Sequence, residues 1–81
     1  MPLPENIDEE KLAEVSLAIL SLGAWSEGAG TRAWKGIDWE VMDLLHQRGW
    51  IGDPVGKQKS VVLTEQGITA AESCMEKHFG K

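Results

Sequence analysis

Apolar residues recur at helical spacing directly after Asp8 in this 81-residue chain. Asp8 is a typical helix N-cap, and Gly23 is of the type found just beyond a helix end, so the pattern predicts a helix between them. The apolar side chains fall on two sides of this helix, with Leu12, Val15, Ile19 and Leu22 on one side and Ala13, Leu17 and Leu20 on the other. The core of so small a domain is thin, and one such side is enough to cover it.

The second apolar side, with Leu17 and Leu20, has three interpretations. If the side containing Leu12 packs on the rest of the domain, Leu17 and Leu20 are free to meet the same patch on a second copy, which predicts a homodimer. Alternatively, the helix is the central core helix and buries both sides. In the third interpretation, residues 24–36 fold back and cover the second side with Trp25.

The same signals predict two further helices. Asp38 is the expected N-cap of the second helix and Gly49 its expected end. The apolar face of this second helix comprises Ile37, Val41, Leu44 and Leu45. Thr64 is the expected N-cap of the third helix, which Gly80 closes, and its apolar stripe comprises Ile68, Ala71, Met75 and Phe79. We expect this stripe to pack against the first helix.

The segments between the helices predict one β-hairpin. Residues 24–36 are expected to be irregular, because they contain a glycine-rich turn sequence. Trp50 and Ile51 begin an extended piece, a Pro- and Gly-containing turn follows, and the β-branched run at residues 60–63 is a strand. The order helix, irregular segment, helix, hairpin wing and helix predicts an α+β, mostly α, winged-helix domain over residues 8–80, after a flexible leader at residues 1–7.

Two stretches of the chain carry family resemblances. The phrases RAWKG-x-DW and DPVGK-x-KSVVLT-x-x-G, between Arg32 and Gly67, resemble a family of small bacterial proteins known only as a domain of unknown function. The segment from Leu44 to Ala71 resembles the end of the recognition helix, the wing and the following helix of bacterial regulators of the multiple-antibiotic-resistance and phenolic-acid types. The resemblances imply a winged helix and a bacterial origin. The regulators pair through their terminal helices, which favours a homodimer, whereas the uncharacterised family implies no activity.

Composition narrows the classes of function. Cys74 is the only cysteine, so we expect a buried thiol and neither an internal disulfide nor a cysteine-based zinc site. No stretch approaches the roughly 18 apolar residues of a membrane span, and the acidic start does not resemble a signal peptide, so we expect a cytoplasmic protein with no membrane partner. The net charge of −5 argues against bulk-charge binding to nucleic acid. Only residues 30–60, with five cations against four acids, could present a basic patch.

Nucleic-acid binding is the function that a winged helix favours. The second helix would be the recognition helix in the major groove, where Gln47 and His46 could read base edges. The candidate nucleic-acid-binding residues are Arg32, Lys35, Gln47, Arg48, Lys57 and Lys59. Glu40 and Asp43 on the same helix repel phosphate. The opposing interpretation is therefore that these cations are ordinary solvated surface charges.

Four tryptophans favour a second function, the recognition of a protein partner. Trp is enriched at binding hot spots. The candidate partner-binding residues are Trp34, Trp39, Met42 and His46, which lie just before the second helix or on its expected outward side. Trp25 and Trp50 are expected to replace core aliphatic residues. Trp34 and Trp39 either pack on each other or dock a partner.

Catalytic, metal and cofactor sites are not expected. Asp43 and His46 share a helical face, but the spacing supplies no third ligand. Cys74 and His78 lie one turn apart without an orienting group, and residues 52–57 fail the spacing of a phosphate loop. The sequence therefore predicts a non-enzymatic winged-helix module without a cofactor or an evident small-molecule substrate. We expect it to act as a homodimer through DNA contact or, alternatively, through protein contact.

Overall fold

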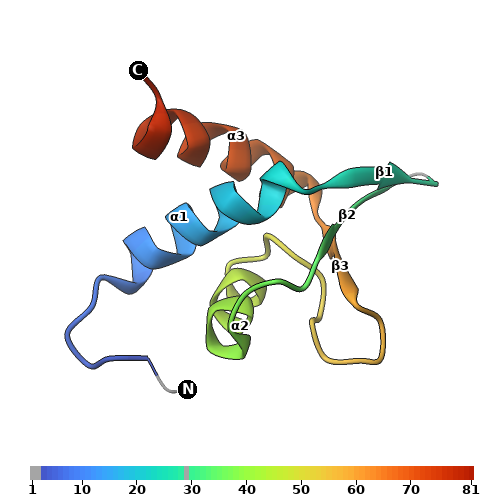
Figure 1. Cartoon of the computed structure of the whole chain (residues 1–81), viewed down its shortest axis with the longest axis horizontal. Helices are drawn as coiled ribbons and strands as arrows, with labels where there is room; N and C mark the ends of the chain where they lie inside the picture. The colour runs from blue at the N-terminus through green and yellow to red at the C-terminus, as the bar shows by residue number, and fades with distance from the viewer. Residues whose placement is uncertain (1–2, 29) are drawn as a thin grey trace.

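Three helices and a three-stranded antiparallel sheet make up residues 3–28 and 30–81, the part of the chain that the computed structural model describes (Figure 1). In chain order the elements are α1 (Glu9–Leu22), β1 (Trp25–Glu27), β2 (Gly30–Trp34), α2 (Trp39–Gln47), β3 (Ser60–Leu63) and α3 (Glu65–Phe79). α1 and α3 lie side by side, α2 packs against α1, and the sheet extends away from the helices (Figure 1). The predicted α+β, mostly helical class is confirmed. Within the described ranges, no helix has the length and apolar character needed to cross a membrane.

Side chains cap the helices where the sequence predicted them to begin. Asp8 Oδ1 accepts a hydrogen bond from the backbone N–H three residues on, at 2.9 Å, and Thr64 Oγ1 does the same, also at 2.9 Å. Asp38 Oδ2 accepts from the backbone N–H two residues on, at 3.0 Å. Each cap satisfies a backbone donor that has no acceptor within its own helix. Gly49 follows α2 with a φ of +76°, which confirms its predicted role at that helix end.

Residues 24–36, predicted to be irregular, instead supply two of the three strands. β1 and β2 form an antiparallel hairpin in which Trp25 lies opposite Arg32, and Gly28 helps to turn the chain with a φ of +61°. β2 pairs with β3 along its other edge, so β2 is the central strand. The prediction was wrong because a glycine-rich turn looks the same in sequence whether it lies in a loop or joins two short strands.

The predicted wing hairpin is reduced to one isolated bridge. Ile51 pairs with Leu63, and β3 takes β2 as its strand partner instead of the segment after α2. Pro54 is buried in that segment and has no backbone N–H with which to extend a ladder. Residues 52–59 therefore form a loop that connects the bridge to β3.

The core lies between the helices and the inner face of the sheet. Its members are Ala13, Leu17, Leu20, Ala33, Met42, Leu45, Ile51, Val61, Leu63 and Ala71. α1 contacts α2, α3 and β2, so it is the central helix of the core. It does not bury both apolar sides, because Leu17 and Leu20 are buried whereas the side with Leu12, Val15, Ile19 and Leu22 is half-buried or exposed.

The burial of Leu17 and Leu20 contradicts their predicted role in a dimer interface. Leu17 is fully buried and Leu20 is 7% exposed, and side chains that fill the core cannot also meet a second copy. Ile19 and Leu22, which were expected on the core side of the helix, are 51% and 73% exposed instead. Ala33 of β2 belongs to the same core cluster as Leu17 and Leu20. Residues 24–36 therefore help to cover that side of α1, as the third interpretation expects, but Trp25 is not part of the cluster.

Candidate functional site

Two exposed tryptophan rings form the clearest candidate site. Trp34 ends β2 and is 60% exposed, and Trp39 begins α2 and is 59% exposed. One shallow hollow is lined by Trp34, Lys35, Trp39, Gly56, Gln58 and Lys59, which we call the Trp34–Trp39 surface. Tryptophan side chains are highly buried on average. Exposed apolar groups that gather at one place mark interaction sites.

The sheet holds the Trp34 ring in place. Trp34 lies on the same face of β2 as Arg32, which is paired with Trp25, so Trp25 and Trp34 are diagonal neighbours across two strands. Their ring centroids are 4.8 Å apart and their planes meet at 41°. The sequence left open whether Trp34 packs on Trp39. Its ring neighbour is the half-buried Trp25, and the face of Trp34 that looks into the hollow is available to a ligand.

Lys35 connects the loop at residues 52–59 to this surface. Its backbone N–H donates to Lys59 O at 2.8 Å, and its Nζ donates to Gly56 O at 3.4 Å. The same Nζ lies 5.8 Å from the centroid of the Trp39 ring, within the range of a cation–π interaction. Lys35 is thus half-buried between the loop and Trp39, while Lys57 and Lys59 are exposed on the loop.

Arg32, a candidate phosphate-binding residue, is engaged within the sheet. Its Nε donates to Ser60 Oγ at 2.8 Å, and its Nη2 donates to Ser60 O at 3.0 Å and to Gln58 Oε1. Its Nε also lies 3.6 Å from Glu27 Oε2, and the side chain is only 18% exposed. Arg32 therefore ties β2 to β3 and to the loop, and its main donors are already used.

Met42, a candidate partner-binding residue, lies in the core at 1% exposure, so that prediction is wrong. The buried residues of α2 are Val41, Met42 and Leu45, whereas Leu44 is only half-buried. The apolar pattern predicted that Leu44 lies on the buried face of α2. The helix is instead rotated so that Met42 lies on that face. With only nine residues, α2 is too short for its pattern to fix this angle.

The exposed side of α2 carries two carboxylates, and a cation follows the helix. Glu40 and Asp43 are exposed, as are the predicted candidates His46 and Gln47. Arg48, which follows α2, places its guanidinium carbon 5.7 Å from the centroid of the half-buried Trp50 ring. The structure thus brings Trp34, Lys35, Trp39 and Lys59 together on one surface, and it leaves Gln47 and Arg48 outside the hollow. Gln58 joins the surface without any signal in the sequence.

Gly67 is required by the close packing of α3 on the backbone of Trp50. A Cβ at this position would lie 1.9 Å from Trp50 O, which also accepts the Thr64 N–H at 3.0 Å. The first turn of α3 therefore packs directly on backbone, and only glycine leaves enough room. The sequence carries one sign of this contact. Glycine lies within a predicted helix, although it makes a helix interior less stable than alanine does by roughly 1 kcal/mol.

A polar cluster joins the end of α3 to α1. Glu14 Oε1 lies 2.8 Å from His78 Nε2 and 3.0 Å from Lys77 Nζ. These two hydrogen bonds, from His78 first and Lys77 second, lower the pKa of Glu14, and the bond to Glu14 raises the pKa of Lys77. Burial raises the pKa of the nearby Cys74 thiol, and the predicted burial of this cysteine is confirmed. Among the described residues, no three His, Cys, Asp or Glu side chains gather as metal ligands would.

The comparison with protein families covers all of these elements. Residues 8–81 match the family described as "Domain of unknown function (DUF6429)". The chain belongs to this family. It is also similar to an uncharacterised protein, y4hR, of Sinorhizobium fredii (strain NBRC 101917 / NGR234), with 45% identity over 74 residues that cover 91% of this chain and 96% of the relative. No solved structure matches the chain.

The DUF6429 match confirms the predicted membership of an uncharacterised family with a bacterial relative. It runs from the N-cap of α1 to the last residue, so the Trp34–Trp39 surface lies inside it. Neither description names an activity, and the function has to be argued from the geometry.

Proposed function

We propose that the protein is a non-catalytic binding module that recognises another protein through the Trp34–Trp39 surface. The observation that carries this proposal is the exposure of two tryptophan rings, at 60% and 59%, around one hollow. Trp is enriched among the residues that supply most of the binding energy at interfaces. A partner that covers both rings gains a large apolar contact from side chains with few rotatable bonds.

The backbone around the two rings favours binding because it is fixed before a partner arrives. Trp34 stands on the central strand and packs on Trp25, and Trp39 stands on the first turn of a capped helix. Lys35 ties the loop to the same place. Little conformational entropy is lost when a partner binds side chains that are already held, so more of the contact energy remains as affinity.

The charges around the hollow favour a partner segment with apolar and acidic side chains. Lys35 and Lys59 are the charged residues among its lining, and Lys57 is exposed on the same loop. Complementary charge at an interface speeds association and selects between partners. An extended segment with one or two large apolar residues between carboxylates can pack its apolar side chains on the two tryptophan rings and pair its carboxylates with the lysines.

We infer further that the module is of the winged-helix type. In this arrangement α2 takes the place of the recognition helix, the loop at residues 52–59 takes the place of the wing, and α3 follows. The order α2, β3, α3 and the position of β2 beside β3 support this arrangement.

DNA is the second candidate ligand, and the exposed Lys57 and Lys59 favour it. Glu40 and Asp43 oppose it because they would face phosphate, and Arg32 is already engaged within the sheet. The β1–β2 hairpin also stands where a short turn leads into the recognition helix of a DNA-binding helix-turn-helix, which makes the match to a DNA reader weaker than the match to the winged-helix order. A protein partner therefore fits the surface better than a DNA duplex.

Peptides selected from a random library against the wild-type protein test this proposal. We expect them to combine large apolar residues with Asp or Glu. Trp39→Ala should weaken their binding at least tenfold by fluorescence anisotropy, because one of the two rings is lost. Trp39 is exposed, so the same substitution should change the free energy of unfolding by less than about 0.5 kcal/mol.

Val55→Ala is the matched control, since Val55 is 74% exposed and lies outside the hollow. It should leave peptide affinity unchanged. Two results would overturn the proposal: selected peptides that bind Trp39→Ala as tightly as wild type, or an unfolding cost of several kcal/mol for Trp39→Ala. A gel shift of short duplex DNA that is abolished by Lys57→Glu/Lys59→Glu, without any peptide binding, would favour the DNA candidate instead.

A further inference from the structure

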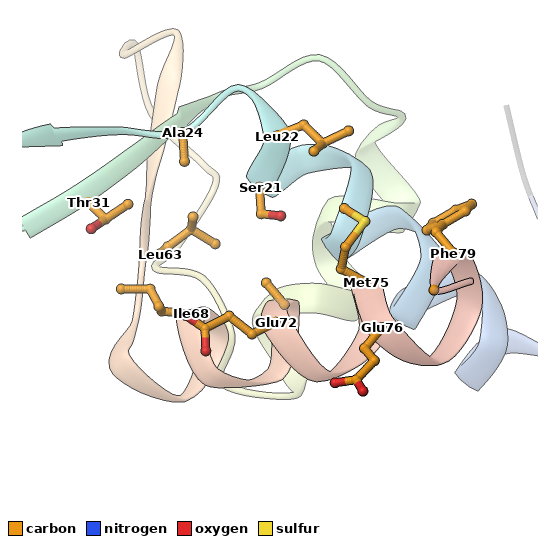
Figure 2. A pocket seen from close by; sticks show the side chains of 12 residues that line it. Ser21, Leu22, Ala24, Thr31, Leu63, Ile68, Glu72, Met75, Glu76 and Phe79 are labelled. Atoms are coloured by element: carbon orange, nitrogen blue, oxygen red, sulfur yellow. The ribbon is translucent and has the colours of Figure 1, made fainter.

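A second hollow lies between the end of α1 and α3, apart from the Trp34–Trp39 surface. Figure 2 shows Leu22 of α1 on one side of it and Met75 and Phe79 of α3 on the other. Ile68 lines its other end, near the sheet, and Glu72 and Glu76 stand along α3 (Figure 2). We call this hollow, with these six of its lining residues, the α1–α3 groove.

The groove is apolar and open to solvent. Leu22 is 73% exposed and Phe79 is 50% exposed, while Met75 and Ile68 are half-buried. Solvent-exposed apolar residues that gather in a concave site are typical of a surface that binds another molecule. This groove is thus a candidate binding site that the sequence pattern did not single out.

The charge along the groove determines what kind of partner fits it. Glu72 and Glu76 are the charged residues among its lining, and they lie one helical turn apart with both side chains exposed. A partner that brings cations to these carboxylates neutralises them, whereas an acidic partner is repelled and an uncharged one leaves them without counter-charges. The whole chain carries a net charge of −5, which adds to the preference for a basic partner.

The same charges argue against a second copy of this chain as the occupant. A two-fold interface uses the same patch on both subunits, so it would bring four carboxylates and two chains of net charge −5 to one contact. Leu17 and Leu20, which the sequence predicts for such an interface, are buried in the core.

The length of the groove matches a short helix. Ile68 and Phe79 are eleven positions apart on α3, which corresponds to about 16 Å at the rise of an α-helix. Three turns of a second helix can lie along this distance and present apolar residues at i, i+3, i+4 and i+7. We propose that the α1–α3 groove binds an amphipathic helical segment of another protein whose apolar stripe is bordered by Lys or Arg.

Two designed helical peptides of about 14 residues test the proposal on the full chain. Both carry Leu at i, i+3, i+4 and i+7, and the border positions are Lys in one peptide and Glu in the other. By fluorescence anisotropy, the Lys peptide should bind at least tenfold more tightly than the Glu peptide. Glu72→Lys/Glu76→Lys should reverse this preference, and Leu22→Ser should weaken the Lys peptide at least fivefold.

Matched controls separate the groove from general charge attraction. Glu5→Lys/Asp43→Lys changes the net charge by the same amount with exposed residues that do not line the groove, and it should keep the preference for the Lys peptide. Val55→Ser, at a site as exposed as Leu22, should leave the affinity unchanged. Circular dichroism should show that each variant retains the wild-type helix signal.

Three outcomes would overturn the proposal. The first is no binding of the Lys peptide at millimolar concentration. The second is equal loss of binding in the groove variant and in the Glu5/Asp43 variant, which would assign the attraction to net charge. The third is a wild-type dimer in sedimentation that Leu22→Ser converts to a monomer, which would give the groove to a second copy.

Discussion

At Gly67 the backbone of α3 comes so close to Trp50 that no other residue fits without movement. Gly67→Ala should destabilise the protein by about 1–3 kcal/mol, the usual range for overpacking, although alanine is the better helix former. The clash is with a backbone carbonyl, which cannot rotate away as a side chain would. Chemical denaturation would measure this change.

Gly36→Ala is the control for this prediction. A Cβ at Gly36 meets nothing within 4 Å, and its φ is not in the left-handed region, so we expect a change below about 0.5 kcal/mol. A Gly67→Ala protein as stable as wild type would show that α3 does not press on Trp50 in solution.

Single residues were the least predictable part of the site. The pattern placed Met42 on the outer side of α2, and the structure buries it. Trp34 and Trp39 were identified as candidates, but their exposure depended on tertiary contacts that no local spacing encodes, such as the ring of Trp25 against Trp34. The sequence predicts Arg32 as a phosphate contact, whereas in the structure its Nε and Nη2 donate to Ser60 and Gln58.

At the scale of elements, the two hydrogen bonds of Glu14 hold the end of α3 against α1. They lower the pKa of Glu14, so the carboxylate stabilises the fold above its usual pKa, near 4.5. This contribution is lost as the pH falls through the lowered pKa of the folded state. Glu14→Gln should therefore lower the melting temperature near neutral pH, and the difference from wild type should shrink as the pH falls below 4.5 and through the lowered pKa.

Melting curves of both proteins between pH 3 and pH 7 would check this prediction. Glu72→Gln, which removes an exposed carboxylate from α3, is the control and should follow wild type across the range. A difference between Glu14→Gln and wild type that stays constant with pH would contradict the role given to the carboxylate charge.

Helices and one strand could be predicted from the sequence, whereas strand pairing could not. Caps at Asp8, Asp38 and Thr64 and the β-branched run of β3 are local signals, and each appears where it was expected. The β1–β2 hairpin was missed because its three-residue strand and glycine turn have almost no local pattern. The partner of β3 was missed because pairing is decided between segments far apart in the chain.

The whole molecule is thin, with extents of 39, 34 and 18 Å, so α1 carries more apolar residues than the interior can bury. A thin domain of this size has little interior, so α1 must serve α2, α3 and the sheet at once. Several of the apolar residues that stay exposed lie at the two candidate surfaces, with Trp34 and Trp39 at one and Leu22 and Phe79 at the other. Their rims differ in charge, with lysines at the Trp34–Trp39 surface and glutamates at the α1–α3 groove, so the two surfaces should select partners of opposite charge.

The indole N–H signals of the four tryptophans offer the most direct measurement of the central claim, that Trp34 and Trp39 form the binding surface. In a two-dimensional NMR titration with a selected acidic, apolar peptide, the Trp34 and Trp39 signals should shift together. Trp25 should follow weakly through its contact with Trp34, and Trp50 should stay in place. Shifts confined to Trp50, or binding that leaves the Trp34 and Trp39 signals unmoved, would contradict the account.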